Sequence, residues 1–252
     1  MIKQLFDASR QEYGTRRIHR ALEALCINVS LYRVRKLMHE LGLKPKARHK
    51  FKVTTRQSKR PHYVAPNKLK RHFTTSKPNE AWVTDITYVP TQEGWLYVAT
   101  VLDLFSRKVV GLAMSQRLKT DLVLRATLQA IKHRKPTPGL ILHSDRGCQY
   151  TSKAYAKLAQ AHGILLSMSG TGNCFDNAVA ESFFHTLKIA LVHNQTFYTR
   201  NQATRTIFEY IECFYNRKRM HSSIGYKSPN QFEQEYYHQK TPYPKQHCLL
   251  NA

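Results

Sequence analysis

Three consecutive apolar segments in the middle of the chain constrain its fold more than any other feature. They are "AWVTDITYV", "GWLYVATVLDLF" and "KVVGLAM", each rich in β-branched and aromatic residues, and the short connections between them contain Pro90, Gly94, Ser106 and Arg107. Segments of this composition with turn residues between them are typical of strands joined as hairpins. We therefore expect an antiparallel three-stranded meander that begins near residue 80.

Helices and strands alternate after this meander. Apolar spacing predicts the following elements in order: helix 122–132, strand 140–143, helix 153–162, strand 164–168, helix 176–193 and helix 201–215. Three strands followed by alternating helices and strands is the order of a ribonuclease-H-like α/β domain.

Positive charge is concentrated at the amino-terminal end. The formal net charge is +24, and residues 1–79 hold 20 of the 40 lysine and arginine residues but only 4 of the 16 acidic residues. This asymmetry favours a polyanionic partner, above all nucleic acid, because phosphate contacts do not depend on base sequence. The alternative is a charged surface that serves solubility alone.

Residues 15–42 are predicted to form two helices joined by a tight turn. Ser30 is a suitable cap for the second helix and Gly42 ends it. The apolar spacing is carried by Ile18, Leu22 and Leu25 in the first helix and by Leu31, Val34, Met38 and Leu41 in the second. The opposite face of the second helix is basic, which suits the recognition helix of a DNA-binding helix-turn-helix. Its candidate DNA-binding residues are Arg33, Arg35, Lys36 and His39. An ordinary solvated helical hairpin is the alternative.

The composition changes divide the chain into four predicted parts. These are a helix-turn-helix segment at 1–45, a proline-containing basic linker at 46–79, the α/β core with carboxy-terminal helices at 80–236, and a tail at 237–252.

Five scattered cysteines include no Cys-x-x-Cys pair, so neither a disulfide framework nor a zinc finger is indicated. No apolar run reaches the roughly 20 residues that a membrane helix needs, and the amino terminus lacks a signal-peptide pattern. We therefore expect a soluble cytoplasmic protein with no membrane partner.

Three acidic residues are the candidates for chemistry. Asp85 lies inside a strand with apolar residues on both sides, Asp145 directly follows a second strand, and Glu181 lies on a helix whose opposite face is apolar. A buried carboxylate is costly without a cation or several hydrogen bonds. We expect all three side chains to point toward one end of the sheet.

Spacing alone does not single these residues out. Asp145 and Glu181 are 36 positions apart, and so are two other pairs, Asp85 with Asp121 and Asp176 with Glu212. Asp121 and Asp176 stand where helices should begin, so capping explains them. A turn-forming Asp-Arg-Gly without any ligand is the alternative for Asp145.

The segments "WVTDITYV", "HSDRGCQYTS" and "GNCFDNAVAESFFHTLK", with the later "YNRKRMHSSIGYKSP", resemble those of a known family. They are similar to retroviral-integrase-like transposases, specifically the second-frame product of the third large family of bacterial insertion sequences. The resemblance implies an integrase catalytic core with a mixed five-stranded sheet and flanking helices. It implies that Asp85, Asp145 and Glu181 form the catalytic triad and that Lys188 holds DNA near the scissile phosphate. Asp103 also matches a recurrent position, which we interpret as structural.

Carboxylates suit the chemistry that this resemblance implies. Magnesium or manganese ions prefer oxygen ligands, and two ions about 4 Å apart can activate the attacking oxygen and stabilise the leaving oxygen in phosphoryl transfer. The expected function is therefore cleavage of DNA at insertion-sequence ends and strand transfer to a target.

The expected partners are double-stranded DNA at the transposon ends and target, further copies of the chain, and the first-frame product as a fusion or partner. Nucleoid association follows from DNA binding. Two alternatives stay open: a non-catalytic DNA-binding regulator, and a ribonuclease-H-type nuclease without joining activity.

Overall fold

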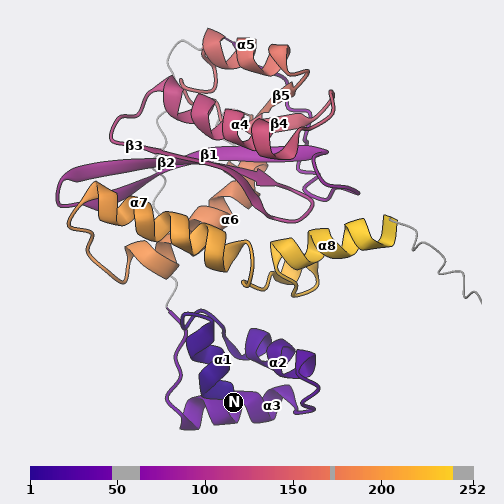
Figure 1. The fold of residues 1–252 in the computed structure, drawn as a ribbon, viewed down its shortest axis with the longest axis vertical. Helices are drawn as coiled ribbons and strands as arrows, with labels where there is room; N and C mark the ends of the chain where they lie inside the picture. The colour runs from indigo at the N-terminus through magenta and orange to yellow at the C-terminus, as the bar shows by residue number, and fades with distance from the viewer. Residues whose placement is uncertain (47–62, 171–173, 241–252) are drawn as a thin grey trace, which may run out of the picture.

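A five-stranded mixed sheet forms the centre of the computed structural model, which describes residues 1–46, 63–170 and 174–240 (Figure 1). The strands lie in the order β3-β2-β1-β4-β5. They are β1 (Ala81–Thr91), β2 (Gly94–Asp103), β3 (Val109–Ser115), β4 (Ile141–Ser144) and β5 (Leu165–Met168). β1, β2 and β3 are antiparallel, whereas β4 is parallel to both β1 and β5. The predicted meander and the two later short strands are confirmed.

Helices cover both faces of the sheet. α4 (Thr120–Arg134) and α5 (Lys153–Ala161) lie on one face, and α6 (Ala178–Leu187) and α7 (Arg200–Glu209) lie on the other (Figure 1). Each face buries its own apolar cluster. α6 and α7 each continue into a π-helical turn, η2 (Lys188–Val192) and η3 (Tyr210–Tyr215), which gives the two long helices that the sequence predicts.

The amino-terminal region contains three helices rather than the predicted two. α2 (Thr15–Ala24) and α3 (Leu31–Glu40) are the expected pair, and α1 (Ile2–Ala8) packs against both. Ser30 caps α3 as predicted, because its hydroxyl accepts a hydrogen bond from the Arg33 amide at 3.2 Å. The predicted apolar stripe is wrong at its ends, where three leucines are exposed because the small three-helix unit covers only the centre of the pair. They are Leu25, Leu31 and Leu41.

The three amino-terminal helices pack against the carboxy-terminal end of the core (Figure 1). Tyr13 donates a hydrogen bond to the Lys218 carbonyl at 3.1 Å and accepts one from the Met220 amide at 2.7 Å. Arg219 and Glu12 form a buried ion pair of 3.0 Å, which Tyr210 supports by donating a hydrogen bond to the same carboxylate oxygen.

Part of the predicted basic linker, residues 47–62, lies outside the described residues. The rest of it packs along β5: Ala65 and Leu69 are buried, and the Lys68 and Leu69 amides donate to the Ser167 hydroxyl at 2.9 and 3.2 Å. Residues 63–79 are thus packed on the core rather than extended away from it.

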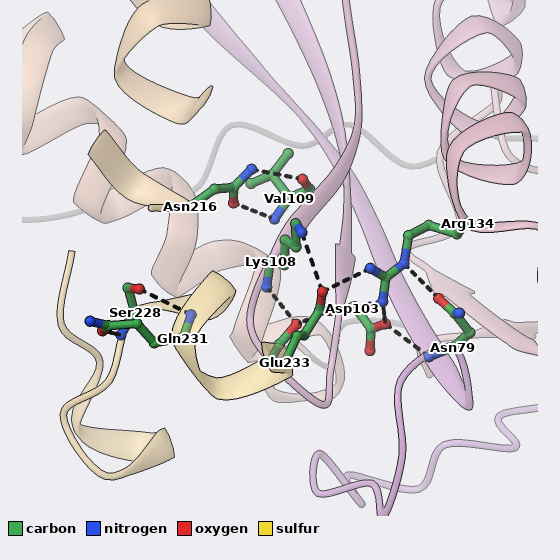
Figure 2. A network of polar contacts seen from close by, with 10 residues as sticks. Asn79, Asp103, Lys108, Val109, Arg134, Asn216, Ser228, Gln231 and Glu233 are labelled. Carbon is green, nitrogen blue, oxygen red and sulfur yellow. Dashed lines mark hydrogen bonds and ion pairs between the residues drawn. The ribbon is translucent and has the colours of Figure 1, made fainter. Parts of the chain in front are cut away.

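The carboxy-terminal helix α8 (Pro229–Lys240) continues past the predicted boundary at residue 236, and residues 241–252 lie outside the described part. Figure 2 shows the polar network that attaches it, centred on Arg134, Asp103 and Glu233. Asp103 is fully buried there and bonds to the Asn79 amide, so its contacts are those of a structural residue. Within the described part of the chain, no helix combines the length and apolar character needed to cross a membrane.

Candidate active site

Asp85 lies within β1, and Asp145 directly follows the neighbouring parallel strand β4. The register of β1 and β4 pairs Val83 with His143, and each aspartate lies two residues after its member of this pair. Side chains two residues apart point to the same face, and neighbouring strands lie about 4.8 Å apart. The two carboxylates therefore project side by side where the paired part of β4 ends.

Backbone amides hold one oxygen of each carboxylate. The Ile86 amide donates to Asp85 Oδ1 at 2.8 Å, and the Gly147 amide donates to Asp145 Oδ1 at 2.9 Å. A Cβ atom at position 147 would lie 3.0 Å from Asp145 Oδ1 and 3.3 Å from Gln149 Oε1. A side chain at position 147 would therefore crowd the Asp145 carboxylate, which glycine avoids.

Glu181 and Lys188 come from the helix that packs against β1 on one face of the sheet. Glu181 lies in the first turn of α6, and Lys188 begins the π-helical turn η2 that continues it. Burial, and then the charge of Asp145, raise the pKa of Glu181. Burial lowers the pKa of Lys188, although the nearby Asp85 charge acts in the opposite direction. Both side chains thus lie within electrostatic range of the aspartates.

Burial makes ionisation of both aspartates unfavourable, and the charge of Asp145 adds to this effect at Asp85. Burial, and then the charge of Asp145, raise the pKa of Asp85 well above its usual value, and Glu181 adds to the rise. Burial raises the pKa of Asp145, against the effect of the Gly147 hydrogen bond. In the absence of a cation, the site therefore resists carrying three negative charges at once.

The three carboxylates are not drawn into one tight cluster. No group of three histidine, cysteine, aspartate or glutamate side chains within residues 1–46, 63–170 and 174–240 is close enough to hold a metal ion. Asp85 and Asp145 line a common cavity of about 820 Å³, whereas Glu181 is not part of its wall. The structure brings the aspartate pair together and leaves Glu181 beside it.

Three aromatic residues border the aspartate pair, and the sequence motifs do not indicate them. They are Tyr88, Trp95 and Tyr97, which line the same cavity together with Leu118. Tyr88 pairs with Tyr97 across β1 and β2, with ring centroids 5.7 Å apart, and Trp95 is 53% exposed. The alternation of side chains along two paired strands is the signal that could have revealed these aromatic residues.

Apart from Lys188, the predicted DNA-binding residues lie far along the chain from the aspartates, on α3. These four residues are exposed; they are Arg33, Arg35, Lys36 and His39. Lys36 also approaches Glu40, at 3.9 Å across one helical turn. The exposed basic face that the sequence predicts is therefore present.

In the other two acidic pairs with the same spacing, Asp121 and Asp176 each have partners of their own, and the prediction of a helix cap is wrong for both. Lys119 holds the cap position of α4, and Asp121 lies within the first turn, where it forms an ion pair of 2.8 Å with Arg125. The Asp176 carboxylate accepts hydrogen bonds from Arg71, Asn67 and the Gly170 amide. Arg71 lies in the predicted linker, and its approach was not visible in local sequence spacing.

Comparison with known proteins agrees with this architecture. Models described as "Integrase core domain" match residues 75–174 and 181–236, and one described as "HTH-like domain" matches residues 1–51. The "Transposase for insertion sequence element IS904" of Lactococcus lactis subsp. lactis (strain IL1403) is 45% identical over 92% of this chain and 91% of its own length. The chain belongs to the insertion-sequence transposase family.

Two further relatives support the assignment of the chain to the insertion-sequence transposases. "Transposase InsF for insertion sequence IS3A" of Escherichia coli (strain K12) is 43% identical over 90% of this chain and 79% of its own length. The "Insertion element IS600 uncharacterized 31 kDa protein" of Shigella sonnei is 42% identical over 94% of this chain and 86% of its own length. These matches and the domain order confirm the predicted second-frame product of the third large insertion-sequence family.

The fold of the transposase is also found among solved structures. A chain of the cryo-EM structure of the simian T-cell lymphotropic virus intasome in complex with PP2A regulatory subunit B56 gamma superposes with a TM-score of 0.52. The match covers 92% of this chain and 74% of the other, at 14% identity. The predicted fold class, an integrase core preceded by a helix-turn-helix-like segment, is confirmed.

Proposed function

We propose that this transposase cleaves DNA at insertion-sequence ends and joins the cut ends to a target at one site, built from Asp85, Asp145 and Glu181. The observation that supports the proposal is that Asp85 and Asp145 line one cavity, each two residues after a paired position of the parallel strands β1 and β4. Membership of the transposase family supplies the reaction class, polynucleotidyl transfer.

The chemistry of the three carboxylates fits divalent metal ions, either magnesium or manganese. Carboxylate oxygens are the ligands that these hard ions prefer, and a cation among the three acids would offset the burial and the repulsion that raise the pKa values of Asp85 and Glu181. Asp85, Asp145 and Glu181 would hold two ions. When bound, the ions would supply activation of the attacking oxygen and stabilisation of the leaving oxygen during in-line displacement.

The remaining side chains position the reactants. The Gly147 amide fixes the Asp145 carboxylate, so that its orientation does not depend on substrate. The Lys188 ammonium, within electrostatic range of Asp85, would bind the DNA phosphate next to the scissile bond. The exposed basic face of α3, with Arg33, Arg35 and Lys36, would bind the duplex away from the reacting phosphate.

The substrate also implies partners. Two DNA ends have to be held together for transposition, so we expect the active form to be an oligomer of this chain on DNA. The first-frame product of the same element is expected to act with it, as a fusion or as a separate subunit.

Triad substitutions test the proposal directly. We expect Asp85→Asn, Asp145→Asn and Glu181→Gln each to reduce magnesium-dependent cleavage of an end-containing duplex below detection, while duplex binding stays close to that of the unaltered protein. Asp121→Asn is the matched control, because it removes an exposed carboxylate on α4 that forms an ion pair with Arg125 on the same helix. Cleavage at the control rate by any one triad variant would refute the assignment.

Pre-cut ends separate the proposed reaction from its two alternatives. A transposase joins a duplex with a free 3′-hydroxyl to a second duplex, whereas a nuclease of ribonuclease H type nicks DNA and yields no joined product. A protein that retains the duplex but neither nicks nor joins it at any magnesium concentration would be a DNA-binding regulator.

A further inference from the structure

A second cavity lies between the amino-terminal helices and the core, away from the aspartate pair. Its volume is about 450 Å³. Arg17 and Lys46 contribute from the amino-terminal side, Arg107 from the connection between β2 and β3, and Arg219 from the segment after η3. Four cationic side chains from four parts of the chain thus converge on one space.

The charge of this cavity is not balanced by its own residues. Glu12 is the one carboxylate in the described lining, and it already pairs with Arg219 at 3.0 Å. Arg107 Nη1 is buried without a hydrogen-bond partner among the described residues. Arg17 donates through Nε to the Met220 carbonyl at 3.1 Å, and no other hydrogen bond of its guanidinium is found in the described part of the chain. The cavity therefore has hydrogen-bond donors available for an anion.

The behaviour of His221, which also lines the cavity, supports this concentration of positive charge. Burial lowers the pKa of His221 well below its usual value, and the charges of Arg219, Arg17 and Arg107 lower it further. The contribution of three arginine charges to this lowered pKa, beside that of burial, indicates a positive potential in which an anion would be stabilised.

The cavity shares a helix with the proposed active site. His185 lines it and lies one turn after Glu181 on α6, and Ser182 and Thr186 of the same helix also face it. The opposite wall belongs to the helix-turn-helix-like region. The cavity therefore lies between the helix-turn-helix-like region and the helix that carries Glu181.

The segment "RMHSSIG" forms part of the cavity wall. It supplies Arg219, His221, Ser222 and Ser223 to the cavity, although none of these residues belongs to the proposed triad. Ser222 and Ser223 are exposed, so their hydroxyls can reach a ligand at the mouth of the cavity.

We propose that this cavity binds a backbone phosphate of the DNA substrate and so fixes the duplex between the amino-terminal helices and α6. The proposal rests on the proposed function, because it takes the substrate to be DNA. A guanidinium binds a phosphate through paired hydrogen bonds, and arginines from both sides of the domain junction would let one phosphate hold the two parts together.

Two pairs of variants test the cavity by measuring duplex binding alone. Arg17→Gln removes a cation from the cavity, and its matched control is Arg125→Gln, which removes one from the exposed surface of α4. Ser223→Asp adds a negative charge at the mouth of the cavity, and Ser223→Asn is its neutral control. The probe is a fluorescein-labelled 30-base-pair duplex, titrated by anisotropy between 50 and 200 mM salt, with circular dichroism and thermal melting to confirm folding.

We expect Arg17→Gln to weaken binding about eightfold at 0.1 M salt and to reduce the slope of log K against log salt by about 0.9, the values for loss of one phosphate contact. Ser223→Asp should produce a loss of similar size. Affinities and slopes of both variants equal to those of their controls would overturn the proposal.

Inorganic phosphate distinguishes the source of the ligand. Thermal stabilisation by 10 mM phosphate, at matched ionic strength, that is lost in Arg17→Gln while DNA binding is unaffected would overturn the DNA assignment in favour of a free anion. Because these measurements need no cleavage, the triad could fail its own test while the phosphate site is supported, and the reverse outcome is equally distinguishable.

Discussion

Arg134 is the residue whose removal we expect to be most costly outside the active site. At the end of α4, its guanidinium donates to Asn79 Oδ1 at 2.8 Å, to Asp103 Oδ2 at 3.0 Å, and to both oxygens of Glu233 at 2.8 Å (Figure 2). The Arg134 side chain is 12% exposed, and those of Asp103 and Glu233 are 0% and 6% exposed. Arg134 therefore forms ion pairs with two buried carboxylates, Asp103 of β2 and Glu233 of α8, and so attaches α8 to the sheet.

Arg134→Met should leave both carboxylates without their main cation. Removing one partner of a buried ion pair typically costs about 3–5 kcal/mol, because the remaining charge stays desolvated. Lys108 and Ser106 still bond to Glu233, and the Asn79 and Phe105 amides still bond to Asp103, so we expect a value within this range and not above it. Arg134→Lys keeps the charge but not the planar fork and should cost about 1–3 kcal/mol.

The assay is urea unfolding of the variants, with Glu233→Gln and the double variant completing a thermodynamic cycle. The pKa of Glu233 is lowered below its usual 4.5 despite burial, because Arg134 bonds to it. A carboxyl group whose pKa is lower in the folded state than in the unfolded state stabilises the fold at pH values above its unfolded-state pKa. This stabilisation is lost as the pH falls through the folded-state pKa. The difference in stability between wild type and Arg134→Met should therefore shrink below about pH 4.5. A change of less than about 1 kcal/mol at pH 7, with unchanged hydrogen exchange in α8, would refute this reasoning.

Three further predictions concern the core and its junction with the amino-terminal helices. Glu12→Gln should destabilise the protein by about 3–5 kcal/mol in urea unfolding, since it leaves the buried Arg219 without a carboxylate; a loss under about 1 kcal/mol would show that the pair is dispensable. His143 is fully buried and its pKa is lowered to about 4. As the pH falls from 7.5 to 5, this imidazole takes up a proton in the unfolded state but stays neutral in the folded state, so about 2 kcal/mol of stability should be lost. His143→Asn should lack this part of the pH dependence, and an identical loss in both proteins would contradict it. Gly111→Ala should lower the melting temperature, at a cost of about 1–3 kcal/mol, because the new Cβ would lie 2.2 Å from the Ala126 carbonyl oxygen; an unchanged melting temperature would show that α4 moves away freely.

The sheet could be predicted from the sequence because its strands carry local signals. "WVTDITYV" and its two neighbours are apolar, β-branched and separated by turn residues, and these properties act within a few residues. Asp85 and Asp145 were identifiable for the same reason, since each stands at a defined place in a strand segment. Their adjacency required the parallel pairing of β1 with β4, which the fold class implies and local spacing does not.

Contacts between distant segments could not be predicted. Glu12 and Arg219 are 207 residues apart and appear as ordinary charged residues in the sequence, yet they form a buried pair. Asp176 stands where a helix cap is expected, but Arg71 from the preceding linker pairs with its carboxylate. Local propensity gives no information about such partners, because tertiary packing decides them.

The acidic residues of the proposed site are positioned in two ways, by strand pairing and by helix packing, and substitutions should affect the two differently. Asp85 lies within β1, the central strand of the sheet, and Asp145 directly follows its neighbour β4, so the pairing of these two strands brings the aspartates to the same part of the sheet. Glu181 is placed by the packing of α6, whose buried residues Ala180, Phe183 and Leu187 set its position over the sheet. Changes in that packing should therefore displace Glu181 while the aspartate pair stays in place.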